Sequence, residues 1–182
     1  MPLNVEESIK THRRPGFVKS CPVEYHGAMN IRQFLRIIEI RTKIIGMTTF
    51  ACGSLYAAWS TGTWAWSRFF IMGLAVLVVD MGTTGFNSYF DYTNGTDNKK
   101  TNLERDKVLV HEGVEPQAAL AISLSLFGTA AMLGLVLAWM TSWWLIVAGG
   151  ACMVVGYAYT GGPYPISRTP LGELFAGGFL GT

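Results

Sequence analysis

The chain has 182 residues, a formal net charge of +2, a mean hydropathy of +0.31 and only 14% charged residues. Soluble domains usually contain about 25% charged residues, so this composition argues against an ordinary soluble domain. Cys21, Cys52 and Cys152 have no metal-ligand spacing and no even disulfide framework, and we expect reduced thiols that pack as small apolar residues. Residues 1–30 lack the apolar core of a signal peptide, so insertion is expected to rely on the first spanning helix.

Four segments are nearly free of charge, and they account for the low charged fraction. They are residues 44–59, 69–86, 118–139 and 143–160, and Asp80 is the one charged side chain among them. About 17–25 apolar residues are needed to cross a bilayer core of about 30 Å. The first segment is slightly short and is expected to recruit flanking residues. The sequence therefore predicts an all-α transmembrane bundle with four complete spans and the start of a fifth near Leu171.

The elements can be placed in chain order. Residues 1–30 are predicted to form a cytoplasmic tail, and residues 31–59 a single helix whose opening "IRQFLRIIEIRTK" suits the membrane interface. A second helix is predicted over 69–90. A polar loop with an Asn94-Gly95 turn follows, and a third helix starts at Glu115-Pro116. The fourth helix is expected to end at Gly161-Gly162-Pro163, before a short inner loop.

The basic residues predict the orientation of these spans. Thirteen of the fourteen Lys and Arg residues lie before the first span, between spans two and three, or after span four, and only Arg68 lies on the other side. The positive-inside rule therefore places the N-terminus and the 87–116 and 161–170 loops in the cytoplasm. All six tryptophans lie at or in the two outer connections, as expected of an interfacial belt.

A polar stripe runs along the second predicted helix. Asp80, Thr84, Asn87 and Asp91 are spaced by four, three and four residues, which places them on one helical face. A carboxylate inside a span costs about 2.5–3.5 kcal/mol on insertion scales, so Asp80 is a functional candidate. A structural hydrogen bond from Asp80 to a neighbouring helix is an equally good interpretation.

Asp97 follows Asp91 across the Asn94-Gly95 turn, and the oxygens of Asn87, Asp91 and Asp97 form a donor set that suits a hard cation. Mg²⁺ typically binds through one or two carboxylates and completes its shell with substrate phosphate. Basic side chains near this loop and on the first helix could neutralise such a phosphate. They are Lys99, Lys100, Arg105, Arg41 and Lys43. The alternative is that these polar residues solvate a loop and these cations only set the topology.

Three stretches resemble the UbiA family of intramembrane prenyltransferases. "NSYFDYTNGTD" at 87–97 resembles that family's first aspartate-rich motif, and "YTGGPYPISRTPLGE" at 159–173 is similar to a stretch after the fourth helix. "EIRTK" at 39–43 resembles the entry to the first helix. The spacing of the first motif is closest to the branch that transfers polyprenyl groups to 1,4-dihydroxy-2-naphthoate in menaquinone synthesis. The resemblance covers residues 31–182.

The chain departs from the family pattern at several points. Ser88 stands where many relatives have Asp, and "ERDKVLVHEG" is only loosely similar to the corresponding Arg-Pro-Leu segment. The family's second aspartate-rich motif does not occur before Thr182. We therefore expect residues 31–182 to be the N-terminal part of such a transmembrane domain, carrying one half of a two-metal diphosphate site.

The resemblance implies transfer of a polyprenyl chain from its diphosphate to an aromatic acceptor, with Mg²⁺ as cofactor. Asn87, Asp91 and Asp97 would be the catalytic and metal-binding residues, and the five basic residues above would contact the diphosphate. Tyr89 and Tyr157 are candidates to stabilise an allylic carbocation, with interfacial anchoring as their alternative role.

The expected partners are the polyprenyl diphosphate, the acceptor and the lipid bilayer of the cell membrane, with no nucleic acid. The alternatives are another acceptor (4-hydroxybenzoate, haem or chlorophyllide), a membrane transporter in which Asp80 and the Asp91 region form an ion path, and an inactive scaffold. The sequence predicts neither the prenyl chain length nor the oligomeric state.

Overall fold

The computed structural model describes residues 30–97, 107–111, 114–162 and 164–174, and in these ranges the chain is helical, with no strand. Its elements are α1 (Ile31–Ile37), the 3₁₀ turn η2 (Ile40–Thr42), α2 (Lys43–Thr61), α3 (Trp66–Thr93), α4 (Val108–His111), α5 (Pro116–Met140), α6 (Trp144–Thr160) and the 3₁₀ turn η3 (Ile166–Arg168). The all-helical fold class is therefore confirmed for this part of the chain. Residues 1–29 of the predicted 1–30 tail lie outside the described residues, and Asn30 caps α1.

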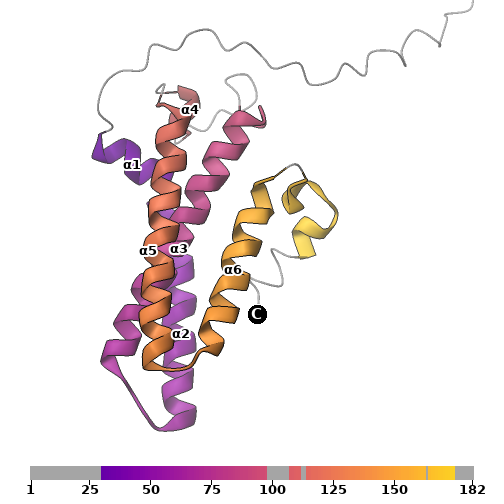
Figure 1. Ribbon diagram of the computed structural model, residues 1–182. Coiled ribbons are helices and arrows are strands. Elements are labelled where there is room, and N and C mark those ends of the chain that lie inside the picture. The colour runs from indigo at the N-terminus through magenta and orange to yellow at the C-terminus, as the bar shows by residue number, and fades with distance from the viewer. Residues whose placement is uncertain (1–29, 98–106, 112–113, 163, 175–182) are drawn as a thin grey trace, which may run out of the picture.

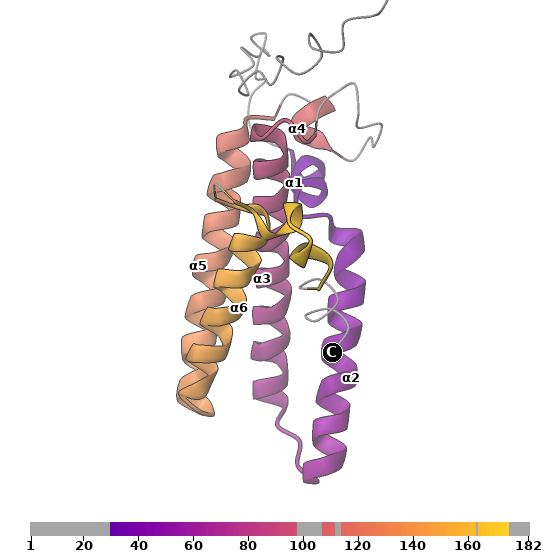
Figure 2. The same cartoon turned by 90° about the vertical axis from the view of Figure 1, so that its right-hand side faces the viewer.

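The long helices form an upright bundle around α3. Helix α5 packs along α3, α2 lies on another side of α3, and α6 contacts both α3 and α5 (Figures 1 and 2). Small residues permit this close packing, since a Cβ at Gly82 would press on the Phe127 ring and one at Gly73 on the Phe50 ring.

Helix ends follow local sequence signals. Asn30 caps α1 in a capping box with Gln33, and Pro116 opens α5 at a position where no amide donor is needed. Gly62 adopts a left-handed conformation (φ 65°) after α2. Helix α6 ends at Thr160 with Gly161 as its cap, where the sequence predicts the end of the fourth helix. The predicted starts and ends of the second, third and fourth helices are thus confirmed to within a few residues.

The prediction of one helix over residues 31–59 is wrong. Helix α1 ends at Ile37, and Glu39 adopts a left-handed backbone (φ 47°) before η2 and α2 begin. Ile37 and Ile38 are almost fully buried beside this break, and the hydroxyl of Ser88 on α3 donates to the Ile37 carbonyl at 3.3 Å. Tertiary packing against α3 therefore holds α1 apart from the axis of α2, as Figure 1 shows.

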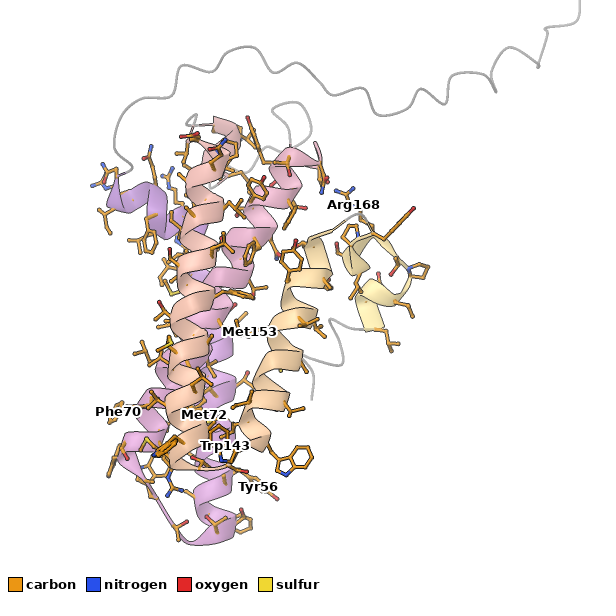
Figure 3. All side chains as sticks on the ribbon, in the orientation of Figure 1. Tyr56, Phe70, Met72, Trp143, Met153 and Arg168 are labelled. Carbon is orange, nitrogen blue, oxygen red and sulfur yellow. The ribbon has the colours of Figure 1, made fainter. Side chains whose placement is uncertain are left out.

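Two helices, α3 and α5, are long and apolar enough to cross a bilayer, and α6 is a shorter apolar helix. Large apolar side chains cover much of the outside of the bundle, and Trp59, Trp139 and Trp144 are about 80% exposed. Figure 3 shows Tyr56, Phe70, Met72 and Trp143 at the end of the bundle opposite to Arg168. This distribution suits a lipid environment, while the four-span count and the orientation stay predictions.

Candidate diphosphate site at the end of α3

Helix α3 is continuous from Trp66 to Thr93, so the predicted polar stripe exists on a single helix. Its members engage different partners along the bundle. Asp80 and Thr84 face α2, whereas Asn87 faces the end of α6. Asp91 lies in the last turn of α3. The stripe therefore divides into a lower part that joins helices and an upper part that carries the candidate site.

Asp97 returns toward Asp91, as the Asn-Gly turn predicts. Gly95 adopts a left-handed backbone (φ 73°), and the Asp97 amide donates a 3.0 Å hydrogen bond to the main-chain carbonyl of Asp91. This hydrogen bond closes the turn over the end of α3. The Asp97 side chain is only 11% exposed. The two carboxylates that the sequence predicts to act together are therefore neighbours on one closed turn.

Asn87 is oriented by the last residue of α6. The hydroxyl of Thr160 donates a short hydrogen bond to the Asn87 side-chain oxygen, and Thr160 itself is buried. Thr160 belongs to the 159–173 stretch, so the two sequence motifs that carried the family resemblance meet here in space. The amide oxygen expected to contact a cation is thus held in a defined direction.

Lys107 lies beside the closed turn. Its ammonium is 3.2 Å from Glu39 Oε1 and 3.6 Å from Asp97 Oδ2. Burial would lower the pKa of the Lys107 ammonium, but the negative charges of Glu39 and Asp97 outweigh this effect and raise the pKa above its usual range. The residue therefore carries its charge at neutral pH and neutralises part of the acidic turn.

Arg168 approaches the turn from the other side. Its guanidinium donates a 2.7 Å hydrogen bond to the Thr96 hydroxyl from η3, which follows α6. Together with Lys107 it provides cations from two separate segments around residues 91–97. Neither residue was predicted from the sequence to belong to the site, because each was interpreted only as a charge that sets the topology.

Lys43 does not point to the turn. Its ammonium lies 2.9 Å from Asp80 Oδ1 and 2.5 Å from the Thr84 hydroxyl oxygen, and the residue is only 4% exposed. Asp80 therefore has the interhelical structural role that was one of its two interpretations. Arg41, the other predicted cation from the first helix region, is exposed on η2. Lys99, Lys100 and Arg105 lie outside the described residues.

The predicted carbocation-stabilising tyrosines belong to an aromatic cluster below the turn. The Tyr157 ring from α6 packs edge-on against Phe86 and Phe90 of α3, and Tyr89 packs edge-on against Phe90. Phe86 and Phe90 line the side of α3 that faces α6. The structure thus packs Tyr157 against Phe86 and Phe90, which precede Asn87 and Asp91 in α3, and places Tyr89 beside the core under α4.

The donor set fits a cation that shares its shell with an anionic ligand. Within the described ranges, no three His, Cys, Asp or Glu side chains gather in a way that could hold a metal ion. Asp91, Asp97 and the oriented amide oxygen of Asn87 nevertheless match the protein ligands of a typical Mg²⁺–phosphate site. In such sites Mg²⁺ binds through one or two carboxylates and completes its shell with phosphate. The donor types are therefore compatible with a cation that is shared with a phosphate.

Several known proteins are similar in sequence to this chain. The chain is 37% identical over 114 residues to 1,4-dihydroxy-2-naphthoate octaprenyltransferase from Bacillus subtilis, which covers 63% of the chain and 36% of that relative. The protein of the same name from Mycobacterium tuberculosis is 30% identical over 129 residues, covering 71% of the chain and 43% of the relative. That from Mycobacterium leprae is 28% identical over 130 residues.

The chain thus spans only about four tenths of the length of the curated relatives it matches. No solved structure matches it. The model of the UbiA prenyltransferase family matches residues 46–182, which include α3 with its closed turn, α5 and α6. The chain therefore belongs to the UbiA prenyltransferase family.

Proposed function

We propose that the complete protein transfers a polyprenyl group from polyprenyl diphosphate to an aromatic acceptor, with 1,4-dihydroxy-2-naphthoate as the acceptor, in quinone biosynthesis. The observation that carries this proposal is the closed turn, which sets Asp97 beside Asp91 at the end of an apolar helix. The relatives named above as 1,4-dihydroxy-2-naphthoate octaprenyltransferases support the choice of acceptor.

The site residues would act mainly on the diphosphate. Asn87, Asp91 and Asp97 would hold Mg²⁺, which when bound supplies positive charge to the leaving group. Arg168 lies close enough to the turn to add a further cation, and Arg41, Lys99, Lys100 and Arg105 are candidates from the neighbouring segments. Thr160 would keep the Asn87 oxygen directed at the site.

The reaction breaks the bond between the allylic carbon and the diphosphate oxygen, and the leaving diphosphate takes both electrons. The resulting cation would lie near the aromatic cluster, where the faces of Tyr157 and Tyr89 can stabilise it. The acceptor ring then forms the new carbon–carbon bond and loses a proton. Apolar helices exclude water that would otherwise quench the cation.

We further propose that the protein is a multi-pass protein of the cell membrane with residues 91–97 on the cytoplasmic side. The charge asymmetry and the two long apolar helices support this placement. A transporter with Asp80 in an ion path has less support, because Lys43 already neutralises Asp80 between the helices.

The proposal is tested in membranes that contain the full-length protein, with octaprenyl diphosphate, Mg²⁺ and a panel of acceptors. We expect transfer to 1,4-dihydroxy-2-naphthoate over 4-hydroxybenzoate, haem and chlorophyllide. Asp91→Ala should lower the rate of diphosphate release by about 100-fold or more, the scale for losing a group that stabilises transition-state charge. Glu115→Gln removes an exposed carboxylate at the start of α5 and serves as the matched control. Undiminished Mg²⁺-dependent turnover in Asp91→Ala would contradict the proposal.

A further inference from the structure

The ammonium group of Lys107 forms ion pairs with two carboxylates from distant parts of the chain. Lys107 lies between Glu39, at the break before α2, and Asp97, on the turn after α3. The hydrogen bond is to Glu39, at 3.2 Å, and the contact to Asp97 is longer, at 3.6 Å. Because a single positive charge is divided between two anions, each of them is neutralised less than it would be alone.

Glu39 is held at this place by the backbone. Among the described residues it is the one non-glycine residue with a positive φ, a conformation that costs about 1 kcal/mol or more for a residue with a side chain. Burial of Ile37 and Ile38 and the hydrogen bond from Ser88 fix the break against α3. The Glu39 carboxylate is therefore presented to Lys107 by the core of the bundle.

We infer that Glu39 is a positioning residue for the candidate diphosphate site: by drawing Lys107 toward itself, it limits the neutralisation of Asp97 and so preserves the attraction of the Asp91–Asp97 turn for a divalent cation. This inference rests on the proposed function and assigns roles to two residues that were not predicted from the sequence to belong to the site. Both carboxylates contribute to the raised pKa of Lys107, which agrees with a charge shared between them.

The inference predicts opposite effects at the two ends of the same ion pair. In Glu39→Gln, Lys107 loses one of its two ion-pair partners and keeps Asp97. The ammonium then neutralises Asp97 more fully, so a divalent cation is expected to bind more weakly. In Lys107→Gln, a positive charge is removed beside the turn, so the cation is expected to bind more tightly. A purely structural ion pair would instead give the same direction of change in both variants.

The experiment uses the purified full-length protein in lipid nanodiscs with Mn²⁺ as the probe, because the electron paramagnetic resonance signal of free Mn²⁺ measures binding without turnover. We expect the dissociation constant to rise about two- to fivefold in Glu39→Gln and to fall by a similar factor in Lys107→Gln, the range of a partly exposed ion pair. The double variant should lie closer to Lys107→Gln than to Glu39→Gln, since Glu39 acts mainly through Lys107. Glu39→Asp and Lys107→Arg retain the charges and should stay close to the parent protein.

The controls separate this inference from the proposed function. Asp91→Ala should abolish the Mn²⁺ binding, and its persistence would overturn the metal site and with it the inference. Binding that depends on Asp91 but shifts in the same direction in Glu39→Gln and Lys107→Gln would overturn the inference alone. An unchanged constant in Glu39→Gln would also overturn it. Elution as a single species in size-exclusion chromatography confirms that each variant is folded.

Discussion

The ammonium of Lys43 lies 2.9 Å from the carboxylate of Asp80, across the interface between α2 and α3. It also contacts the Thr84 hydroxyl oxygen and, at 3.4 Å, the main-chain carbonyl of Asp80. Gly46 allows this approach, because a Cβ there would stand 3.2 Å from Asp80 Oδ2. The pair therefore ties the first long helix to the helix that carries the candidate site.

Breaking this pair from one side should destabilise the bundle. Asp80→Leu leaves the buried Lys43 ammonium without its counter-charge, and we expect a loss of about 3 kcal/mol, the lower end for a buried pair because the Asp80 side chain is 37% exposed. Thermal unfolding in detergent measures the effect. The double variant Lys43→Met/Asp80→Leu removes both charges and should recover most of the stability. Equal losses in the single and double variants would contradict a mutual neutralisation.

Gly85 should not tolerate a larger residue. A Cβ at Gly85 would collide with the hydroxyl of the fully buried Ser123 on α5, so Gly85→Ala is expected to cost about 1–3 kcal/mol. Gly53→Ala is the matched control, since open space surrounds that position in α2 and the change should be neutral or stabilising by up to about 1 kcal/mol. Both are measured as shifts in melting temperature. A second substitution, Ser123→Ala, should relieve part of the Gly85→Ala penalty.

Thr160→Val should impair the site without disturbing the helices. The change removes the hydroxyl that donates to the Asn87 side-chain oxygen, and loss of one such hydrogen bond corresponds to about a tenfold decrease in kcat/KM for prenyl transfer. Thr160→Ser keeps the donor and should retain activity. Thr129→Val removes an exposed hydroxyl that bonds only within α5, and it controls for the substitution itself. Equal activity in Thr160→Val and the parent protein would show that Asn87 needs no fixed orientation.

The Lys107 ion pairs should contribute constant stability at neutral pH. Because the pKa of Lys107 is raised in the folded protein, the stabilisation is complete below the ordinary lysine value of 10.5 and is lost only as the pH rises through the higher folded value. The difference in melting temperature between the parent protein and Lys107→Gln should therefore be flat between about pH 8 and pH 9.5, above the range in which carboxylates titrate. A difference that shrinks across this interval would mean that the ammonium loses its proton early.

Labelling from outside the cell tests the proposed orientation. With the native cysteines replaced by alanine, Asn94→Cys should be protected from a membrane-impermeant maleimide in intact cells, because residues 91–97 are proposed to face the cytoplasm. Ser142→Cys, in the turn between α5 and α6, should react. Both side chains are exposed in the bundle, so the comparison reports on sidedness. The reverse pattern would invert the topology.

Local sequence signals predicted most of the helices and the approach of Asp97 to Asp91 in the candidate site. Runs without charge located the second, third and fourth helices, and the Asn94-Gly95 turn predicted the return of Asp97. The break at Glu39 was missed, because "IRQFLRIIEIRTK" contains no glycine or proline. It arises from the burial of Ile37 and Ile38 and from the hydrogen bond of Ser88.

The partners of the site residues could not be predicted in the same way. Lys107 contacts Glu39 across 68 residues of sequence, and Thr160 contacts Asn87 across 73. The first pair depends on how α1 and α4 pack on α3, and the second on how α6 packs on α3, which no local pattern specifies. The same holds for Lys43, whose charge suggested a phosphate contact until its position against Asp80 was known.

The hydrogen bond between Arg168 and Thr96 joins segments 72 residues apart, and this separation has a consequence for biosynthesis. During translation, the turn at residues 94–97 leaves the ribosome long before Arg168 does. Helices α5 and α6 lie between them in the sequence, so both must be synthesised before the guanidinium can reach the Thr96 hydroxyl. The acidic turn therefore acquires this cationic contact only after α5 and α6 have been synthesised.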